Sequence, residues 1–309
     1  RIRIRPLVVP CGLMTLAAVF PPMVTPFTAG GDVDAQAIGR NVERWMHAGL
    51  GGVVALGTNG EAALLEEHEA ESVVEAVRTA VPPGRLLIVG TGRESTRATI
   101  AATRRAAALG ADLALVRTPS FFKGQMTAPV LVAHFLAVAD ASPIPVLLYN
   151  FPGQTGVNFS SETVGTLARH PNIAGMKETG TDAAQLAGFV DAAASSTFAV
   201  LVGAAPGFYP ALCVGAVGGI VAAACVLPEL CVRLHRLARE GRHSEARALQ
   251  RLLTPLGRLV TTTHGVPGLK AAMNLAGYEG GDPRPPLAPV SPVVREEIRI
   301  ELARVLEAA

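Results

Sequence analysis

Lys177 is the residue of this sequence best suited to covalent chemistry. The chain contains three lysines, Lys123, Lys177 and Lys270, and its other basic residues are arginines. Lys177 falls in NIAGMKE (172–178), a nearly apolar stretch typical of a buried strand. Because burial disfavours the charged form of an amine, a buried lysine is neutral more often, and a neutral amine can attack a ketone to form an imine. The alternative is a structural lysine that forms an ion pair with Glu178 or another carboxylate.

Two other sites could act together with such a lysine. Tyr149 closes the apolar run IPVLLYN (144–150), and a phenol beside an imine can move protons and position a substrate. A tyrosine that only anchors a loop is the alternative. In GTNGE (57–61), glycines allow backbone N–H groups to turn toward a carboxylate, and the Thr58 hydroxyl can assist them. The alternative is a tight strand–helix turn that Glu61 caps.

Eight short apolar runs are expected to position these residues. They are nearly continuous rather than alternating, which is typical of strands buried on both faces. The runs lie at 17–24, 51–57, 85–92, 111–118, 144–150, 172–178, 198–204 and 217–223. The segments between them have helical spacing, most clearly at 66–81 and 95–110, where Ser95 is a plausible N-cap and Gly110 a plausible C-terminal cap.

Eight strand–helix units predict an α/β fold of the (β/α)8 TIM-barrel class. The alternative, a doubly wound sheet, usually has fewer strands and a phosphate loop, and no GxGxxG or GxxxxGK[ST] motif occurs. Helical patterns alone follow residue 226, at 227–241, 243–262, 266–277 and 291–308. The predicted organisation is therefore an N-terminal extension over 1–14, a barrel over 15–226 and a C-terminal helical region over 227–309.

The barrel prediction gathers the polar residues that end the strands. In this fold the active site lies at the carboxyl ends of the strands, so these side chains are expected to share one mouth. They are Thr58, Asn59, Glu61, Thr118, Tyr149, Asn150, Lys177, Glu178 and Thr179.

Composition argues against several other classes of function. The 27 basic and 25 acidic residues give a net charge of +2, which provides no patch for nucleic acid. The seven histidines are scattered without an HExxH motif, so no metal site is expected. The four cysteines form no CxxC pair, which favours a reducing compartment. No uninterrupted apolar run of about 20 residues occurs, so no membrane association is expected.

Three motifs in order along the chain carry a resemblance to a known family. GTNGE (57–61), YNFPGQTG (149–156) and GMKETG (175–180) resemble the dihydrodipicolinate synthase / N-acetylneuraminate lyase family of class I pyruvate-dependent aldolases. The similarity extends over the chain from about residue 15. It implies a small 2-oxo acid as substrate, no cofactor beyond a covalent imine on Lys177, and a homotetramer built as a dimer of dimers.

The resemblance also implies a role for each matched residue. Lys177 would be the Schiff-base lysine and Tyr149 the proton-handling phenol. Thr58 and Asn59 would hold the carboxylate of the 2-oxo acid, while Gly203 and Ile220 would line the pocket through backbone groups.

Two residues depart from the pattern of the family. Gln154 stands where the synthase branch has an arginine that engages a substrate carboxylate, and a neutral amide cannot replace that charged fork. Phe121, in TPSFFKG (118–124), stands where the family lends a tyrosine to a neighbouring subunit. The chain resembles most closely the 4-hydroxy-2-oxoglutarate aldolase branch, in which Thr179 would handle the substrate hydroxyl. Cys225 replaces an asparagine of that branch.

The leading hypothesis is a Schiff-base lyase that cleaves a 4-hydroxy-2-oxo acid to pyruvate and a small aldehyde. The alternatives are a synthase that condenses pyruvate with an aldehyde, a non-catalytic barrel that binds keto acids, and a phosphate-handling barrel isomerase, for which VGAAPG (202–207) is a faint match. Lys270 is expected to be structural. A cytoplasmic location is expected, with an organellar one as the alternative.

Overall fold

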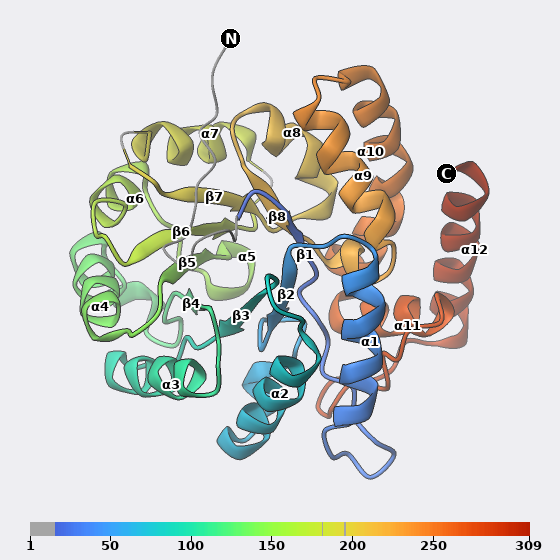
Figure 1. Ribbon diagram of the computed structural model, residues 1–309, viewed down its shortest axis with the longest axis horizontal. Helices are drawn as coiled ribbons and strands as arrows, with labels where there is room; N and C mark the ends of the chain where they lie inside the picture. Colours follow the sequence, from blue (N-terminus) through green and yellow to red (C-terminus); the bar gives the residue numbers. More distant parts are fainter. Residues whose placement is uncertain (1–15, 181, 195) are drawn as a thin grey trace.

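Eight parallel strands form the centre of the structure (Figure 1). This computed structural model describes residues 16–180, 182–194 and 196–309. The strands are β1 (Val19–Phe20), β2 (Gly52–Ala55), β3 (Leu86–Gly90), β4 (Leu113–Arg117), β5 (Val146–Asn150), β6 (Ile173–Glu178), β7 (Ala199–Val202) and β8 (Gly218–Ile220). Their order is β1-β8-β7-β6-β5-β4-β3-β2, and a parallel bridge between Pro22 and Val54 closes the ring. The predicted (β/α)8 barrel is confirmed.

Helices surround the strands on the outside of the barrel (Figure 1). They are α1 (Ala35–His47), α2 (Glu67–Ala80), α3 (Thr96–Ala108), α4 (Ala128–Ala141), α5 (Pro152–Thr155), α6 (Ser161–Leu167), α7 (Ala183–Ala192) and α8 (Phe208–Cys213). The Ser95 side chain accepts a hydrogen bond from the Ala98 N–H group at the start of α3. Gly110, with φ of +90°, follows the end of the same helix. Both predicted caps are therefore confirmed.

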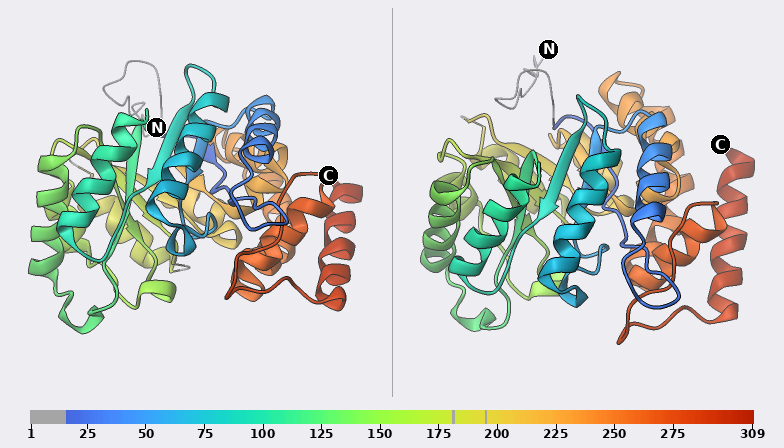
Figure 2. Two further views of the ribbon diagram at one scale, coloured as in Figure 1. Left: turned by 90° about the horizontal axis from the view of Figure 1, so that it is seen from below. Right: turned by 60° about the horizontal axis from the view of Figure 1, so that its bottom comes forward.

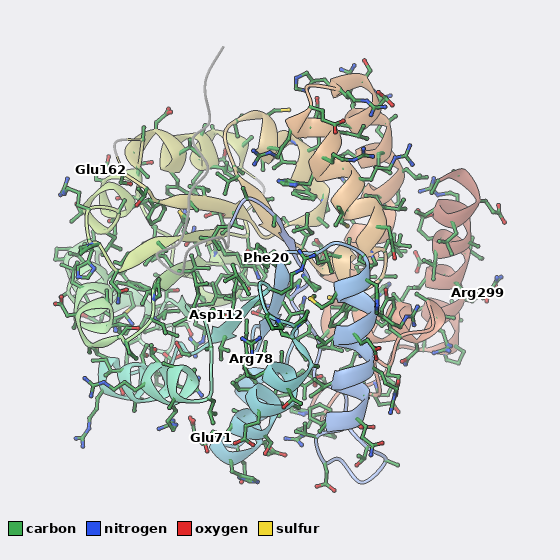
Figure 3. All side chains as sticks on the ribbon, viewed as in Figure 1. Phe20, Glu71, Arg78, Asp112, Glu162 and Arg299 are labelled. Atoms are coloured by element: carbon green, nitrogen blue, oxygen red, sulfur yellow. The ribbon has the colours of Figure 1, made fainter. Side chains whose placement is uncertain are left out.

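Apolar side chains form two layers, one inside the barrel and one between the strands and the helices. Side chains alternate along each strand, so β5 sends Leu147 and Tyr149 inward and Val146 and Leu148 outward. Phe20 fills the inner layer near the centre of the molecule (Figure 3). The nearly continuous apolar runs in the sequence reflect the presence of both layers.

Four further helices lie against the flank of the barrel beside α1 (Figure 2). They are α9 (Pro228–Arg239), α10 (His243–Arg258), α11 (Gly265–Leu275) and α12 (Pro292–Ala308), with a π-helical turn over Leu259–Thr263. Trp45 of α1 stacks on Tyr278 at 5.9 Å, and its indole N–H group donates to the Cys225 carbonyl. The C-terminal segment is thus packed closely against the barrel.

The domain boundaries remain partly untested. The predicted extension over 1–14 lies outside the described residues. The last strand ends at Ile220, a 3-10 turn covers Ala222–Cys225, and α9 begins at Pro228. The boundary at 226 stays a prediction. Within the described residues, no helix is both long and apolar enough to cross a membrane.

Candidate active site

Lys177 lies inside the barrel beside Tyr149. The register of β5 and β6 pairs these two residues directly, so their side chains point to the same face. The Lys177 side chain is 4% exposed, and its Nζ atom lies 4.3 Å from the centre of the Tyr149 ring. Within the described part of the chain, Lys177 has no carboxylate partner. The alternative of a salt-bridged structural lysine is therefore not observed.

The neighbouring carboxylate, Glu178, belongs to a separate network. Its Oε2 atom accepts a hydrogen bond from Asn150 Nδ2 at 2.6 Å, and its Oε1 atom accepts one from the Gly180 N–H group. Burial raises the pKa of Glu178, although the hydrogen bonds from Asn150 and Gly180 oppose this effect. Because its oxygens are engaged there, Glu178 leaves the Lys177 amine unpaired.

Thr58 extends the arrangement toward solvent. Its Oγ1 atom lies 3.1 Å from the Tyr149 hydroxyl, and either group can be the donor. The Thr58 side chain is exposed, whereas Tyr149 is 4% exposed. Three groups with the chemistry of a proton relay thus run from the buried amine to the mouth of the barrel.

The turn that carries Thr58 has an unusual backbone. Leu56 and Glu61, which flank it, have φ values of +55° and +54°, a region that residues other than glycine rarely adopt. The Leu56 carbonyl packs so closely on Gly90 that a Cβ atom there would lie 1.9 Å from the oxygen. Asn59, on the same turn, donates from Nδ2 to the Pro22 carbonyl at 3.3 Å. The Glu61 side chain does not cap the 3-10 turn that follows it.

A third group of residues approaches Lys177 from the ends of β6 and β7. A Cβ atom on Gly203 would lie 2.2 Å from Thr179 Oγ1 and 2.9 Å from Lys177 Cε, so only glycine permits this packing. Thr179 Oγ1 is buried and has no hydrogen-bond partner in the described structure. Ile220, at the end of β8, packs in the same inner layer as Tyr149. The Thr179 hydroxyl is therefore available to a ligand beside Lys177.

Two predicted residues lie at the surface of the single chain instead. Phe121 is 78% exposed and packs against Phe122 with ring centres 5.0 Å apart. Gln154 is exposed on α5. The structure therefore does not bring either residue to Lys177 within one chain, and their roles stay predictions.

Glu94 anchors the loop that carries Phe121. Its carboxylate accepts hydrogen bonds from the backbone N–H groups of Ser120 and Phe121, both at 2.9 Å, and pairs with Arg117 at 2.8 Å. Burial opposes ionisation of Glu94, but these backbone hydrogen bonds and the Arg117 guanidinium lower its pKa to about 2. The loop is thus held through its backbone.

Cys225 is a buried neighbour of Lys177 whose role in the site was not predicted. Its Sγ atom lies 3.4 Å from the Pro22 carbonyl, to which it donates. Burial, followed by the nearby Cys231, raises the pKa of the Cys225 thiol well above its usual range, against the opposing charge of Lys177. A neutral buried thiol is no nucleophile, so Cys225 acts here as a packing residue.

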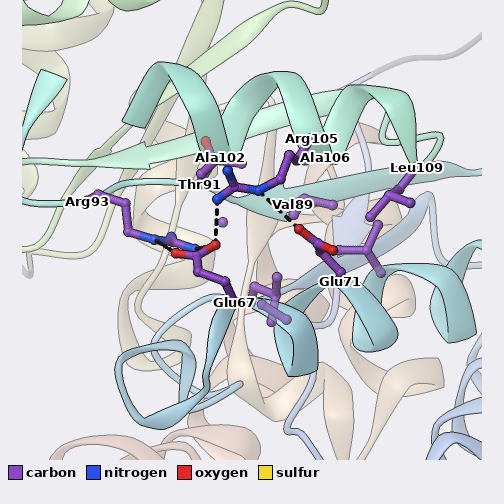
Figure 4. Close-up of a pocket in the computed structure, with 13 residues that line it drawn as sticks. Glu67, Glu71, Val89, Thr91, Arg93, Ala102, Arg105, Ala106 and Leu109 are labelled. Carbon is purple, nitrogen blue, oxygen red and sulfur yellow. Dashed lines mark hydrogen bonds and ion pairs between the residues drawn. The ribbon is translucent and has the colours of Figure 1, made fainter. Parts of the chain in front are cut away.

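Two hollows lie outside this arrangement. A groove of about 440 Å³ runs between the N-terminus of α7 and the end of α10, with Asp182 and Arg258 in its lining. A small hollow of about 20 Å³ between α2 and α3 is closed by ion pairs, in which Glu67 joins Arg93 and Arg105 (Figure 4). The hydrogen bond from Arg93 is the main cause that lowers the pKa of Glu67. In the described residues, no cluster of His, Cys, Asp and Glu could hold a metal ion.

Comparison with known proteins identifies the family. The model of the dihydrodipicolinate synthetase family matches residues 15–309. This chain belongs to that family. Its members are class I aldolases that use a lysine Schiff base with pyruvate and no separate cofactor.

Individual members of the dihydrodipicolinate synthetase family match most of the chain. A 4-hydroxy-tetrahydrodipicolinate synthase from Xanthomonas campestris pv. campestris is 38% identical, over 90% of this chain and 91% of the relative. A probable mitochondrial 4-hydroxy-2-oxoglutarate aldolase from Emericella nidulans is 36% identical, over 88% and 90%. The crystal structure of dihydrodipicolinate synthase from Acinetobacter baumannii with pyruvate is 31% identical, with a TM-score of 0.88 and coverage of 94% and 99%. The two activities named among these relatives are two of the functions that the sequence left open.

The sequence did not predict one contact of the site. Glu61, at the end of the Thr58 turn, forms a buried ion pair with Lys270 of α11 at 2.6 Å. The scarcity of lysine, which drew attention to Lys177, applies equally to Lys270 and is the signal that could have indicated it.

Proposed function

We propose that this protein is a Schiff-base lyase that cleaves a 4-hydroxy-2-oxo acid, such as 4-hydroxy-2-oxoglutarate, to pyruvate and glyoxylate. The observation that carries the proposal is the unpaired Lys177 amine, 4.3 Å from the Tyr149 ring centre, with Thr58 3.1 Å from the phenol. The amine, the phenol and the surface hydroxyl follow one another in space, and they are the groups that imine chemistry requires.

The chemistry assigns each group a step. The neutral Lys177 amine attacks the C2 carbonyl of the substrate. The Tyr149 phenol gives its proton as water leaves, so the step yields a protonated imine and a Tyr149 phenolate. The C3–C4 bond then breaks as the C4 hydroxyl loses its proton to the Tyr149 phenolate. The bonding electrons move into the imine to form an enamine, and glyoxylate leaves. The Tyr149 phenol then protonates C3. Hydrolysis of the imine releases pyruvate and returns a proton to the phenolate, which restores both the amine and the phenol.

The remaining residues are proposed to hold the two ends of the substrate. Thr58, Asn59 and the backbone of their turn would bind the carboxylate next to the ketone. Thr179, whose buried hydroxyl is unpartnered, would contact the C4 hydroxyl of the substrate. Gly203 and Ile220 would shape the wall between them. Because polar groups without partners are costly to bury, the free Thr179 hydroxyl supports a ligand at this position.

A synthase that condenses pyruvate with an aldehyde is the second candidate, and the names of the bacterial relatives favour it. Gln154 argues against it, since an exposed neutral amide stands where the synthase branch has a charged residue. Rates of pyruvate consumption with glyoxylate and with aspartate semialdehyde will separate the two. A higher kcat/KM with aspartate semialdehyde would replace the lyase proposal with the synthase.

The decisive experiment is intact-mass spectrometry after incubation with pyruvate and borohydride, with Lys177→Ala measured alongside. We expect a stable pyruvyl adduct on the wild type and none on the folded variant. A wild type that is folded but forms no adduct would replace the lyase proposal with the non-catalytic keto-acid-binding barrel. An adduct that persists in Lys177→Ala would move the imine to another lysine.

We also propose a homotetramer in the cytoplasm. The exposed Phe121 and Phe122 pair supports association, because exposed aromatic side chains are enriched at interfaces. Light scattering of the wild type and of Phe121→Ser/Phe122→Ser tests this directly. A wild-type monomer would contradict the proposed assembly.

The fungal relative carries the word mitochondrial in its name, so fractionation of cells that express the full chain tests the location.

A further inference from the structure

Lys270 is buried in α11, and three oxygen atoms surround its amine. Its Nζ atom donates to the carbonyl oxygens of Thr25 and Asp282, both at 2.8 Å, and lies 2.6 Å from Glu61 Oε1. The Phe27 ring centre lies 4.5 Å from the same atom. Lys270 is 1% exposed and Glu61 is 3% exposed. Burial lowers the pKa of Lys270, while the interaction with Glu61 opposes that shift.

The second partner of this ion pair belongs to the turn that carries Thr58. The Glu61 N–H group donates to the Thr58 carbonyl at 3.1 Å, so movement of Glu61 is transmitted to Thr58. The Thr25 hydroxyl donates to the Gly60 carbonyl at 2.7 Å, and the Thr25 carbonyl is itself held by Lys270. Lys270 therefore holds the 57–61 turn at two points. It contacts Glu61 directly, and it contacts Gly60 indirectly, through Thr25.

The backbone conformation of this turn depends on the contacts that hold Glu61. Glu61 has a φ of +54°, which costs about 1 kcal/mol or more for a residue other than glycine. A residue in this region keeps its conformation only where its surroundings hold it. The Glu61 carboxylate is held on both sides, by Lys270 at Oε1 and by the Arg284 N–H group at Oε2, 2.7 Å away.

We propose that Lys270 is a positioning residue of the active site, which fixes the 57–61 turn so that Thr58 can hold the carboxylate of a 2-oxo acid beside Lys177. This inference rests on the proposed function. A buried ion pair adds little net stability compared with apolar residues of the same size, but it does fix direction. The three oxygen atoms around Lys270 come from three separate segments, the loop between β1 and α1, the 57–61 turn and the connector after α11.

The test measures the initial rate of borohydride trapping against pyruvate concentration in the full chain. We expect the half-saturating pyruvate concentration to rise about tenfold or more in Lys270→Met and Glu61→Gln, because small displacements of binding groups have large effects. A purely structural role would lower the fraction of active protein and leave half-saturation unchanged. The conservative Lys270→Arg variant keeps the charge and is expected to recover part of the affinity.

Asn172 offers a matched control at the opposite end of the barrel. Its Nδ2 atom donates to the carbonyls of Ala139 and Ser142 at 2.9 and 3.0 Å, before β6 begins. Asn172→Ala removes a comparable polar clamp and is expected to lower stability without changing the half-saturating pyruvate concentration. An equal rise in that variant would overturn the proposal.

The double variant Lys270→Met/Glu61→Gln addresses folding, since it leaves no unpaired charge in the interior. We expect it to fold and still to require more pyruvate. Wild-type half-saturation in the double variant would overturn the positioning role, even with the proposed function intact. If the wild type itself forms no adduct, the failure belongs to the proposed function instead.

Discussion

Lys177 and Lys270 are both buried, yet their surroundings are opposite. Lys177, 4% exposed, faces the Tyr149 ring and has no carboxylate partner within the described residues. Lys270, 1% exposed, faces two carbonyl oxygens and a carboxylate. The comparison indicates that burial alone does not define a lysine's function. An amine surrounded by acceptors is held in place, whereas an amine without a carboxylate partner can turn toward a ketone.

The largest expected effect is the loss of activity in Lys177→Met. Without the amine no imine can form, so turnover should fall by about 10³-fold or more and the pyruvyl adduct should disappear. The free energy of unfolding should stay within about 0.5 kcal/mol of the wild-type value, because the substitution removes a buried amine that has no compensating partner. Urea unfolding and a turnover assay measure the two effects. A loss of several kcal/mol would show that Lys177 also supports the fold.

Lys270→Met should behave in the opposite way in the unfolding assay. Removing one partner of a buried ion pair leaves Glu61 uncompensated, which costs about 3–5 kcal/mol. Thermal and urea unfolding at neutral pH measure this loss, with Asn172→Ala as a reference for a partly buried polar group elsewhere. A destabilisation below that of the reference variant would contradict the contrast between the two lysines.

Lowering the pH should weaken the ion pair between Glu69 and Arg284, whose backbone N–H group also holds Glu61. The Arg284 guanidinium, despite the burial that opposes it, lowers the pKa of Glu69 from 4.5 to about 2. An acid with a lowered pKa stabilises the fold above its unfolded pKa, and this contribution is lost as the pH falls from about 4.5 toward 2. After screening by solvent, we expect about 1–2 kcal/mol. Urea unfolding from pH 6 to 2 should show a smaller loss in Glu69→Gln; parallel curves would refute this assignment.

Substitution of Lys123, the third lysine of the chain, is expected to have the smallest effect on stability and turnover. It is exposed, and it forms no ion pair with the described residues, while its side chain lies over Gly156. Lys123→Met should change the free energy of unfolding by less than about 0.5 kcal/mol. Turnover should also change by less than about twofold, because a substitution at an exposed position usually has a small effect. A tenfold loss of kcat/KM would instead place this ammonium in contact with the substrate.

The sequence was sufficient to predict the fold and the proximity of Tyr149 and Lys177. Strands buried on both faces require continuous apolar runs, so each run marked one strand. The rule that strand ends share one mouth then brought Tyr149 and Lys177 together, and β5 and β6 pair them directly.

The rest of the site depends on information that no local pattern carries. Glu61 and Lys270 are far apart in the chain, and neither flanking sequence encodes the contact between them. The left-handed conformation of Leu56 has no glycine to mark it, and it depends on the small size of Gly90 on the next strand. The three lysines also differ in exposure and in the groups that face each amine, although their residue type is the same.

The Glu61–Lys270 contact also has a consequence for synthesis of the chain on the ribosome. The 57–61 turn is synthesised before most of the barrel, whereas Lys270, which holds it, lies in α11, after the last strand. At translation rates of roughly 5–20 residues per second, the early segments wait on the order of 10 seconds or more for Lys270. A nascent chain can therefore complete much of its barrel before Lys270 is available, and the site is complete only after α11 has been synthesised.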